Sequence, residues 1–478
     1  MKKAISTLLA VSMCAVALAG CGKSTSTDST ASTETTSENT ADAEGAATPE
    51  DSAASETSTS MDQFENKKLN IAVFEGGYGP DYWNEIIDKF EAAYPGIEVE
   101  MQISPSIGDV IRPQIVAGNV PDFIVMNDND PTGLIASMIK EKGLMDLTDV
   151  FEGPGIDDDT LLKDQVNDGI LETAKCQPYG DGKIYLAPFN SSPMGLVYNK
   201  TLFEEMGYEL PTTWEEFFAL GDQAKKDGYA LMTYAGIYPG YMESLLWPSL
   251  ASATGIDNVD DISNYVEGSC STPETIEVLE NIAKIGTGGY LLDGTVALNH
   301  TQSQTEMMMN KCLFIPNGNW MENEMAEAPR ADNFEFGLWT APVLKEGDQA
   351  YVMTSVEQFS IPANAKNPEL AKEFLRFLYT EDSVRLFAEK ANGIYALKDA
   401  TELSKELVSD GIYSMNAIYE HGISMVFGFA ALPEGCKVVP RDKVFKALSD
   451  VMSGKMSAEE WAQGIEDSFK EVNSMTTQ

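Results

Sequence analysis

The stretch from Gly180 to Lys200, GDGKIYLAPFNSSPMGLVYNK, constrains the fold of this chain more than any other. A Gly-Asp-Gly turn signal opens it, and two apolar runs of strand length follow, 184–187 and 194–198, with a polar break between them. If the two strands belong to different lobes, Asn190 and Ser191 in the break can face a cleft. A surface hairpin is the alternative that the local sequence leaves open. A crossing between lobes requires the two strands to lie in different sheets.

The first part of the chain carries the pattern of a βαβ unit. Apolar residues alternate over 69–73, recur at helical spacing from Trp83 to Tyr94, and alternate again over 97–103. A right-handed crossover makes the two strands parallel. Ligand sites in such sheets lie beyond the carboxyl ends of the strands, which is where Glu75 and Tyr78 follow the first strand.

Polar residues also follow the apolar run 123–126. Asn127 and Asp128 stand directly after it and precede Pro131. They are candidates for the same ligand site, although an ordinary turn and helix cap use the same residue types.

Aromatic residues gather between Ala235 and Trp247, where Pro239-Gly240 interrupts the pattern. Because of this break, not all the rings can share one buried face. Tyr241 and Trp247 are candidates for stacking on a pyranose ring, whose hydroxyls would bind carboxylates and amides. Helix packing is the competing explanation.

The amino terminus predicts export. Lys2 and Lys3 precede a short apolar run that ends in Leu-Ala-Gly-Cys21, so residues 1–20 read as a lipoprotein signal peptide and Cys21 as the lipidated residue. A plain secretory signal is the alternative. Residues 21–65 are rich in Ser, Thr, Ala, Asp and Glu, which predicts a disordered tether.

Composition excludes several classes of partner. The formal net charge of −43 argues against nucleic acid and anionic lipid, which both require clustered Lys and Arg. Only two histidines are present and no calcium-loop pattern occurs, so we expect no metal site and no cofactor. Four cysteines follow the lipidation motif, and the sequence does not decide whether they form disulfides: Cys176, Cys270, Cys312 and Cys436.

The DGK-I-Y-x-x-P passage with its closing Y-N-K, followed by LFEEMGYELPTTWEEF, resembles the extracellular solute-binding proteins of bacterial carbohydrate ABC importers, the maltose-binding-protein-like family 1. The resemblance implies an α/β, periplasmic-binding-protein-like two-lobe fold of type II character, with a hinge and a ligand cleft between the lobes. It implies that lobe 1 comprises 66–190 and 358–410, and that lobe 2 comprises 191–357 and 411–478.

Further motifs of the resemblance imply site residues. The run FIPNGNWME resembles the family's G-x-W turn, which implies that Trp320 lies under the ligand and Asn319 beside it. The run TSVEQFSIP resembles the second crossing, so Glu357 would face the cleft, and a third crossing is expected near Asp410-Gly411. The sequence GNWMENE is similar to the N-acetylglucosamine- and chitobiose-binding branch.

The function expected from these features is that of a lipid-anchored binding protein, not an enzyme, which delivers a mono- or oligosaccharide to the transmembrane subunits of a permease. We expect a monomer on the outer face of the cell membrane, held there by its lipid alone. A secreted glycoside hydrolase is the alternative from another class, although no local motif proposes its carboxylate pair. A peptide ligand, or a polyamine held by Glu75, Asp128 and Glu357, also remains open.

Overall fold

The structure is a computed structural model that describes residues 64–126, 132–433 and 435–476. The expected leader, nearly all of the expected tether, and the candidate residues Asn127 and Asp128 lie outside these residues. The described residues all belong to one compact unit, Ser60–Gln478. Phe64, at their start, is 7% exposed and belongs to a core cluster. Among the described residues, none of the helices combines the length and the hydropathy that a membrane span requires.

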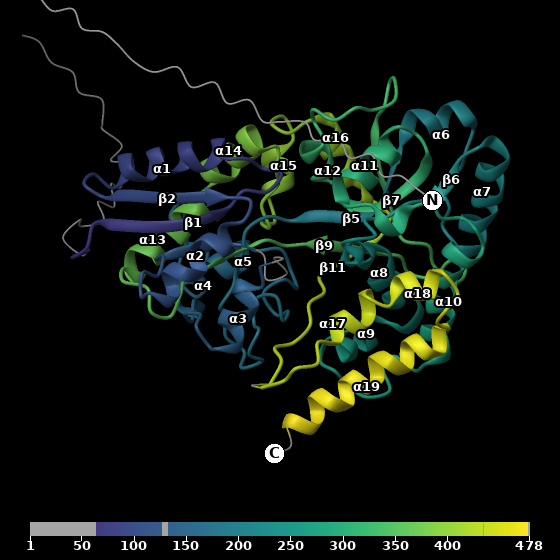
Figure 1. The fold of residues 1–478 in the computed structure, drawn as a ribbon. Helices are drawn as coiled ribbons and strands as arrows, with labels where there is room; N and C mark the ends of the chain where they lie inside the picture. The colour runs from purple at the N-terminus through teal and green to yellow at the C-terminus, as the bar shows by residue number, and fades with distance from the viewer. Residues whose placement is uncertain (1–63, 127–131, 434, 477–478) are drawn as a thin grey trace, which may run out of the picture. The chain divides into compact units, whose positions relative to one another are not determined.

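The first lobe is built on a sheet of five described strands, in the spatial order β2 (Glu98–Ser104), β1 (Lys68–Phe74), β3 (Phe123–Val125), β10 (Gln358–Ser360) and β4 (Ala187–Pro188) (Figure 1). β1 is parallel to both β2 and β3, as the βαβ pattern predicts. β10 is antiparallel to β3 and β4. The carboxyl ends of β1 and β3 therefore share one edge of the sheet.

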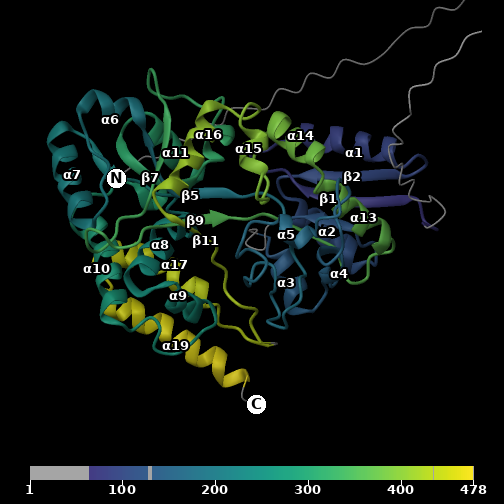
Figure 2. The same cartoon turned by 180° about the vertical axis from the view of Figure 1, so that it is seen from behind.

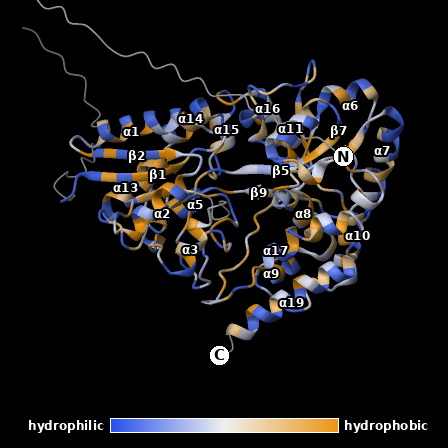
Figure 3. Ribbon diagram, viewed as in Figure 1, coloured by the Kyte–Doolittle hydropathy of each residue, from blue (hydrophilic) through white to orange (hydrophobic). Residues whose placement is uncertain are grey.

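Helices cover both faces of this sheet: α1 (Asp81–Ala93), α13 (Pro368–Leu378) and α14 (Glu381–Ala391) on one, and α2 (Ile107–Val116) and α3 (Leu134–Lys140) on the other (Figures 1 and 2). The alternation of β1 explains this. Ile71 and Val73 pack in the cluster that contains Phe90 of α1, whereas Ala72 packs in the cluster that contains Ile111 of α2. Figure 3 shows the matching two-sided colouring of α1, whose hydrophobic side faces the sheet. Shorter helices complete the lobe: α4 (Thr148–Phe151), α5 (Leu162–Gln165) and α15 (Ala400–Ser404).

The second lobe has a sheet of six described strands. Five lie in the order β11 (Ile423–Met425), β9 (Tyr351–Ser355), β5 (Ser192–Asn199), β7 (Cys312–Gly318) and β6 (Ala230–Met232), and β8 (Phe336–Trp339) also pairs with β5. β5 is antiparallel to its three partners, β7, β8 and β9. All eight of its residues are buried, as expected for a central strand.

The helices of the second lobe divide between two core clusters. One face of the sheet packs against α7 (Trp214–Asp227), α8 (Glu243–Thr254), α9 (Ile256–Ser263), α10 (Pro273–Thr287), α17 (Pro440–Phe445), α18 (Leu448–Met452) and α19 (Ala458–Thr476), with α6 (Lys200–Met206) beside them. The other face packs against α11 (His300–Met308), α12 (Met321–Glu324) and α16 (Asp410–Asn416). Three short 3-10 turns join these elements: η2 (Pro239–Met242), η3 (Thr295–Ala297) and η4 (Ala417–Glu420).

The stretch from Gly180 to Lys200 is a crossing between the lobes. β4 pairs in the first sheet and β5 pairs in the second, so the two strands part at 189–191 and do not form a hairpin. The chain returns between β9 and β10, around Glu357. It leaves the first lobe again between α15, which packs on α14, and α16, which packs on β8. The prediction of a two-lobe α/β fold is therefore confirmed.

Local signals in the sequence explain several of these boundaries. A capping box of Thr213 and Glu216 opens α7, and Gly228 ends it in the left-handed region with φ 93°. The expected strand 184–187 is shorter than predicted, since β4 begins only at Ala187. The reason is local, because the amides of Tyr185 and Leu186 donate to the carbonyl of Cys176, in a loop, and not to a neighbouring strand.

Candidate functional site

Segments from both lobes meet at the end of β7. A Cβ atom added to Gly77, in the loop after β1, would lie 3.6 Å from the carbonyl oxygen of Trp320. The hydroxyl of Tyr78 lies 2.8 Å from Oγ of Ser192, at the start of β5. The loop that follows β1 therefore contacts both the crossing and the expected tryptophan turn.

Trp320 owes its position to the glycine two residues before it. A Cβ atom at Gly318 would overlap the six-membered ring of the indole, so the ring rests directly on the backbone at the end of β7. The tryptophan remains half-buried, with part of its surface accessible. A half-exposed indole on a rigid strand end can stack on an apolar face of a ligand.

Asn319, between these two residues, is 3% exposed. Its backbone amide donates to the carbonyl of Pro193 at 3.2 Å. Its side-chain Oδ1 is buried and has no hydrogen-bond partner among the described residues. A buried acceptor without a partner is costly, and a ligand hydroxyl would satisfy it.

A tyrosine and a carboxylate extend the cluster within the second lobe. The pKa of Tyr241 is raised above its ordinary value, first by burial and then by the negative charges of Glu324 and Glu243. The phenol therefore stays protonated and can donate a hydrogen bond. Glu324 is fixed in turn, because its Oε2 accepts from Nε2 of Gln304 at 2.8 Å and its Oε1 lies 3.5 Å from Nε2 of His300. We call Tyr78, Tyr241, Asn319, Trp320 and Glu324 the Trp320 cluster.

The crossings themselves hold a carboxyl group. Oδ1 of Asn190 accepts from the amide of Glu357 at 3.3 Å, and the amide of Phe189 donates to the Glu357 carbonyl at 2.7 Å. Burial raises the pKa of the Glu357 carboxyl to about 7, and a hydrogen bond with Asn190 opposes this rise. The charge of Glu357 also raises the pKa of Tyr78, after burial. Glu357 and Asn190 therefore adjoin the Trp320 cluster through Tyr78.

The remaining candidate residues from the sequence are not part of the Trp320 cluster, although Glu75 stands in the same loop as Tyr78. Glu75 follows β1 and is half-buried, with its amide bonded to the carbonyl of Ser104 at 3.1 Å. Ser191 lines a cavity on the β11 side of the crossing strands. Trp247 is 1% exposed in α8 and stacks on Phe427 with ring centroids 3.9 Å apart. The packing of Trp247 is thus that of a core residue.

Sequence reasoning missed the support that α11 gives to the cluster. His300 and Gln304 stand four residues apart on this helix and both approach Glu324. The capping box of Asn299 and Gln302, which fixes the start of α11, was the available signal. Glu322, beside the tryptophan, instead accepts from the Ser409 hydroxyl at 2.8 Å.

The described residues contain no candidate metal site, because no group of three or more His, Cys, Asp or Glu residues among them is arranged to hold an ion. The four cysteines of the described residues are all buried, and no disulfide joins any two of them: Cys176, Cys270, Cys312 and Cys436.

Comparisons with known proteins agree with this architecture. The profile of the family described as bacterial extracellular solute-binding protein matches residues 76–385. The chain is similar to the diacetylchitobiose binding protein NgcE of Streptomyces coelicolor, with 28% identity over 68% of each chain. It is also similar to a maltooligosaccharide ABC transporter solute-binding lipoprotein of Streptococcus pneumoniae, with 23% identity over 80% of this chain and 88% of that one.

The fold has a counterpart among solved structures. A chitin oligosaccharide binding protein superposes with a TM-score of 0.63 at 19% identity, over 86% of this chain and 99% of the other. The profile match extends from the loop after β1 into α14 and includes two of the three crossings. On this evidence the chain belongs to the bacterial extracellular solute-binding protein family.

Proposed function

We propose that this protein is the lipid-anchored substrate-binding component of an ABC importer, and that it captures a mono- or oligosaccharide, with amino sugars in its range, between its two lobes. The observation that carries the proposal is the half-exposed indole of Trp320, which rests on Gly318, while the backbone of Trp320 lies against Gly77 in the loop after β1 of the other lobe. Aromatic faces stack on the C–H face of a pyranose, and nearby carboxylates and amides bind its hydroxyls.

The geometry of two lobes suits the affinity that such a task needs. Micromolar binding corresponds to about −8 kcal/mol, a large value for a sugar of a few tens of atoms or fewer. Enclosure of nearly the whole ligand between lobes supplies the required contacts, and hinge closure in periplasmic binding proteins is a known way to achieve it. Asn319 Oδ1, Tyr241, Glu324 and Glu75 are the polar groups that we assign to ligand hydroxyls, and Asn127 and Asp128 remain predictions.

The remaining parts of the proposal concern the cell surface. Cys21 carries the lipid, residues 21–65 span the distance from the membrane, and the loaded protein docks as a monomer on the transmembrane subunits of the permease. The Leu-Ala-Gly-Cys21 sequence supports the anchor, and the similar Streptococcus pneumoniae protein is named a lipoprotein. Cys21→Ala should move the protein from the membrane fraction to the medium, and a variant that stays with membranes would contradict the anchor.

A turnover assay separates this proposal from the hydrolase alternative. The protein is incubated with chitin and starch fragments, and products are followed by chromatography beside equilibrium dialysis of the same fragments. We expect stoichiometric binding without product. Release of shorter sugars in proportion to protein concentration would contradict the proposal and turn attention to Glu357 as an acid.

A further inference from the structure

A polar cavity lies away from the Trp320 cluster. It has a volume of about 850 Å³ and is lined from both lobes, by residues such as Asn167 and Thr401 of the first and Tyr419 and Ser424 of the second. β11 forms part of its wall, at one edge of the second sheet. β7, which positions Trp320, lies on the other side of β9 and β5 in the same sheet. The two sites are therefore separated by the crossing strands, and we call this one the β11 cavity.

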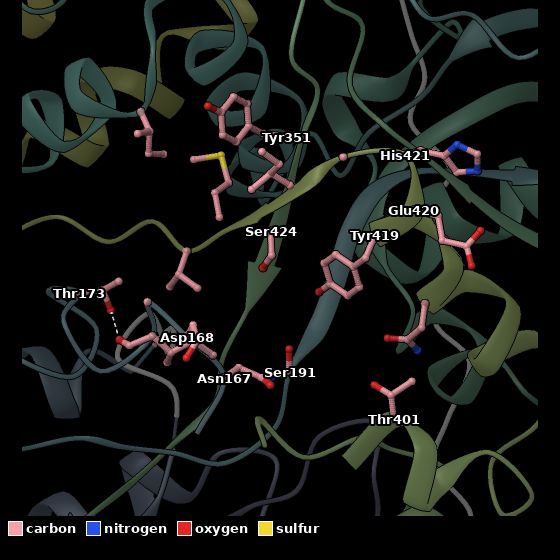
Figure 4. A pocket seen from close by; sticks show the side chains of 18 of the residues that line it. Asn167, Asp168, Thr173, Ser191, Tyr351, Thr401, Tyr419, Glu420, His421 and Ser424 are labelled. Carbon is pink, nitrogen blue, oxygen red and sulfur yellow. Dashed lines mark hydrogen bonds between the residues drawn. The ribbon is translucent and has the colours of Figure 1, made fainter. Parts of the chain in front are cut away.

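Hydroxyl groups converge in the β11 cavity. Figure 4 shows the side chains of Ser191, Tyr419 and Ser424 directed toward one another across the hollow. Oγ1 of Thr354, behind them in β9, lies 2.9 Å from the Tyr419 hydroxyl and 2.7 Å from Oγ of Ser424. The lining is thus ordered in advance by a shared hydrogen bond and does not need to form on binding.

The crossing itself contributes to this wall. Ser191 is 9% exposed and is held by its amide, which donates to the carbonyl of Ile394 at 3.0 Å. It directly follows Asn190, which bonds to Glu357 beside the Trp320 cluster. One backbone segment therefore presents adjacent residues to the two sites.

Charge and size narrow the class of ligand. Among the described residues that line the cavity, none is Lys or Arg, which disfavours an anion. Three carboxylates also line the cavity. Asp168 is paired with Lys398 at 2.9 Å, and Glu420 points away from the converging hydroxyls (Figure 4). The pKa of Asp260 is raised first by burial and then by the charges of Asp257 and Asp261, which disfavours its charged form. Hydroxyls and amides each offer both donors and acceptors, which matches a neutral polyhydroxylated molecule. The volume lies in the usual range for small-molecule sites.

We propose that the β11 cavity is a second binding site, which takes a neutral polyol of monosaccharide to disaccharide size and bridges the two lobes behind the crossing strands. Because such a ligand contacts both lobes, its binding depends on their relative arrangement. Linkage then requires that a polyol in the β11 cavity and a sugar at the Trp320 cluster change each other's affinity by the same factor.

Variants of the full-length protein test the site. Sorbitol and trehalose are titrated against the Trp320→Ala variant by ligand-detected NMR, with spermidine as a cationic probe. We expect saturable binding of at least one polyol to persist in this variant. Adding Tyr419→Phe, which removes one hydroxyl and keeps the ring, should weaken it about 3- to 10-fold, as expected for loss of one hydrogen bond. Ser424→Trp, which fills the cavity from an exposed strand, should abolish it.

Tyr413→Phe is the matched control, because Tyr413 lies in α16 close by in sequence and does not line the cavity. It should leave polyol binding unchanged. The proposal is overturned if the Trp320→Ala variant binds neither polyol, or if Tyr413→Phe weakens polyol binding as much as Tyr419→Phe does. It is also overturned if the cavity substitutions alter the binding of spermidine alone. Loss of sugar binding on Trp320→Ala with polyol binding intact would support both sites independently.

Discussion

At the scale of single residues, the contact between Gly318 and Trp320 decides how an aromatic platform is presented. Gly318→Ala would place a methyl group inside the indole ring and force the tryptophan to move. We expect a loss of about 1–3 kcal/mol in the free energy of unfolding, the usual cost of overpacking. Denaturant titration measures it. Gly464→Ala is the control, because the added methyl group meets open space in α19 and should be neutral or slightly stabilising. Equal effects of the two substitutions would mean that the ring does not depend on Gly318.

Glu357 should make the stability of the protein depend on pH. Its carboxyl pKa rises from 4.5 to about 7 on folding, so the folded state favours the protonated form. The contribution to stability is complete below pH 4.5 and is lost as the pH rises toward 7. Between pH 4.5 and pH 8 the free energy of unfolding of the parent protein should fall by on the order of 2 kcal/mol more than that of the Glu357→Gln variant, after allowance for partial exposure of the carboxyl.

Urea titrations of both proteins at several pH values in this window measure the difference. Glu346→Gln, at an exposed position in the loop before β9, is the matched control and should run parallel to the parent protein. If the free energy of unfolding of Glu357→Gln also changes with pH in parallel with that of the parent protein, the Glu357 carboxyl does not titrate as its surroundings imply.

At the scale of elements, a polar junction joins α12 to the start of α16 at the third crossing. The Ser409 hydroxyl accepts from the amide of Ile412, as an N-cap, and donates to Glu322 at 2.8 Å. The Ser409 amide donates to Oδ1 of Asn392, whose Nδ2 donates to Asn323 at 2.6 Å. These bonds tie an element of the second lobe to the loop after α14 of the first.

Ser409→Ala should therefore cost more than a simple cap. We expect about 1–2 kcal/mol for the cap and the unpaired acceptor together, and a coupling of about 0.5–2 kcal/mol with Glu322→Gln in a double-mutant cycle. Ser457→Ala, at the capped start of α19, should cost a similar amount for the cap but show no coupling with Glu322→Gln. Additive effects of Ser409→Ala and Glu322→Gln would show that the junction does not act as a unit.

Individual helices and strands were the features that could be predicted best from the sequence. Periodicity and turn residues located β1, α1 and β2, and the capping signals of α7 and α19 depend only on neighbours in the chain. The burial of Trp247 depends on Phe427, which lies 180 residues further on in the sequence and stacks on the indole ring inside a core. The support of Glu324 by His300 and Gln304 similarly requires the turn of the chain between α11 and α12. Local pattern carries no information on such contacts.

At the scale of the whole molecule, the three crossings make each lobe from separate parts of the chain. The Trp320 cluster therefore combines the loop after β1 with the end of β7, although the chain from α1 to β4 in the first lobe and from β5 to α11 in the second separates them in sequence. A ligand that bridges these parts binds the folded two-lobe arrangement and not the unfolded chain. It should raise the unfolding temperature in proportion to RT ln(1 + [L]/Kd).

The most direct test is a thermal-shift comparison of the parent protein and Trp320→Ala across monosaccharides, amino sugars, chitin and starch oligosaccharides, and spermidine. The parent should be stabilised by at least one saccharide, by about 2.7 kcal/mol at a hundredfold excess over Kd. Trp320→Ala should lose most of this response while Trp339→Ala, a half-buried tryptophan of β8, keeps it. A full saccharide response in Trp320→Ala, or a response of the parent to spermidine alone, would contradict the account.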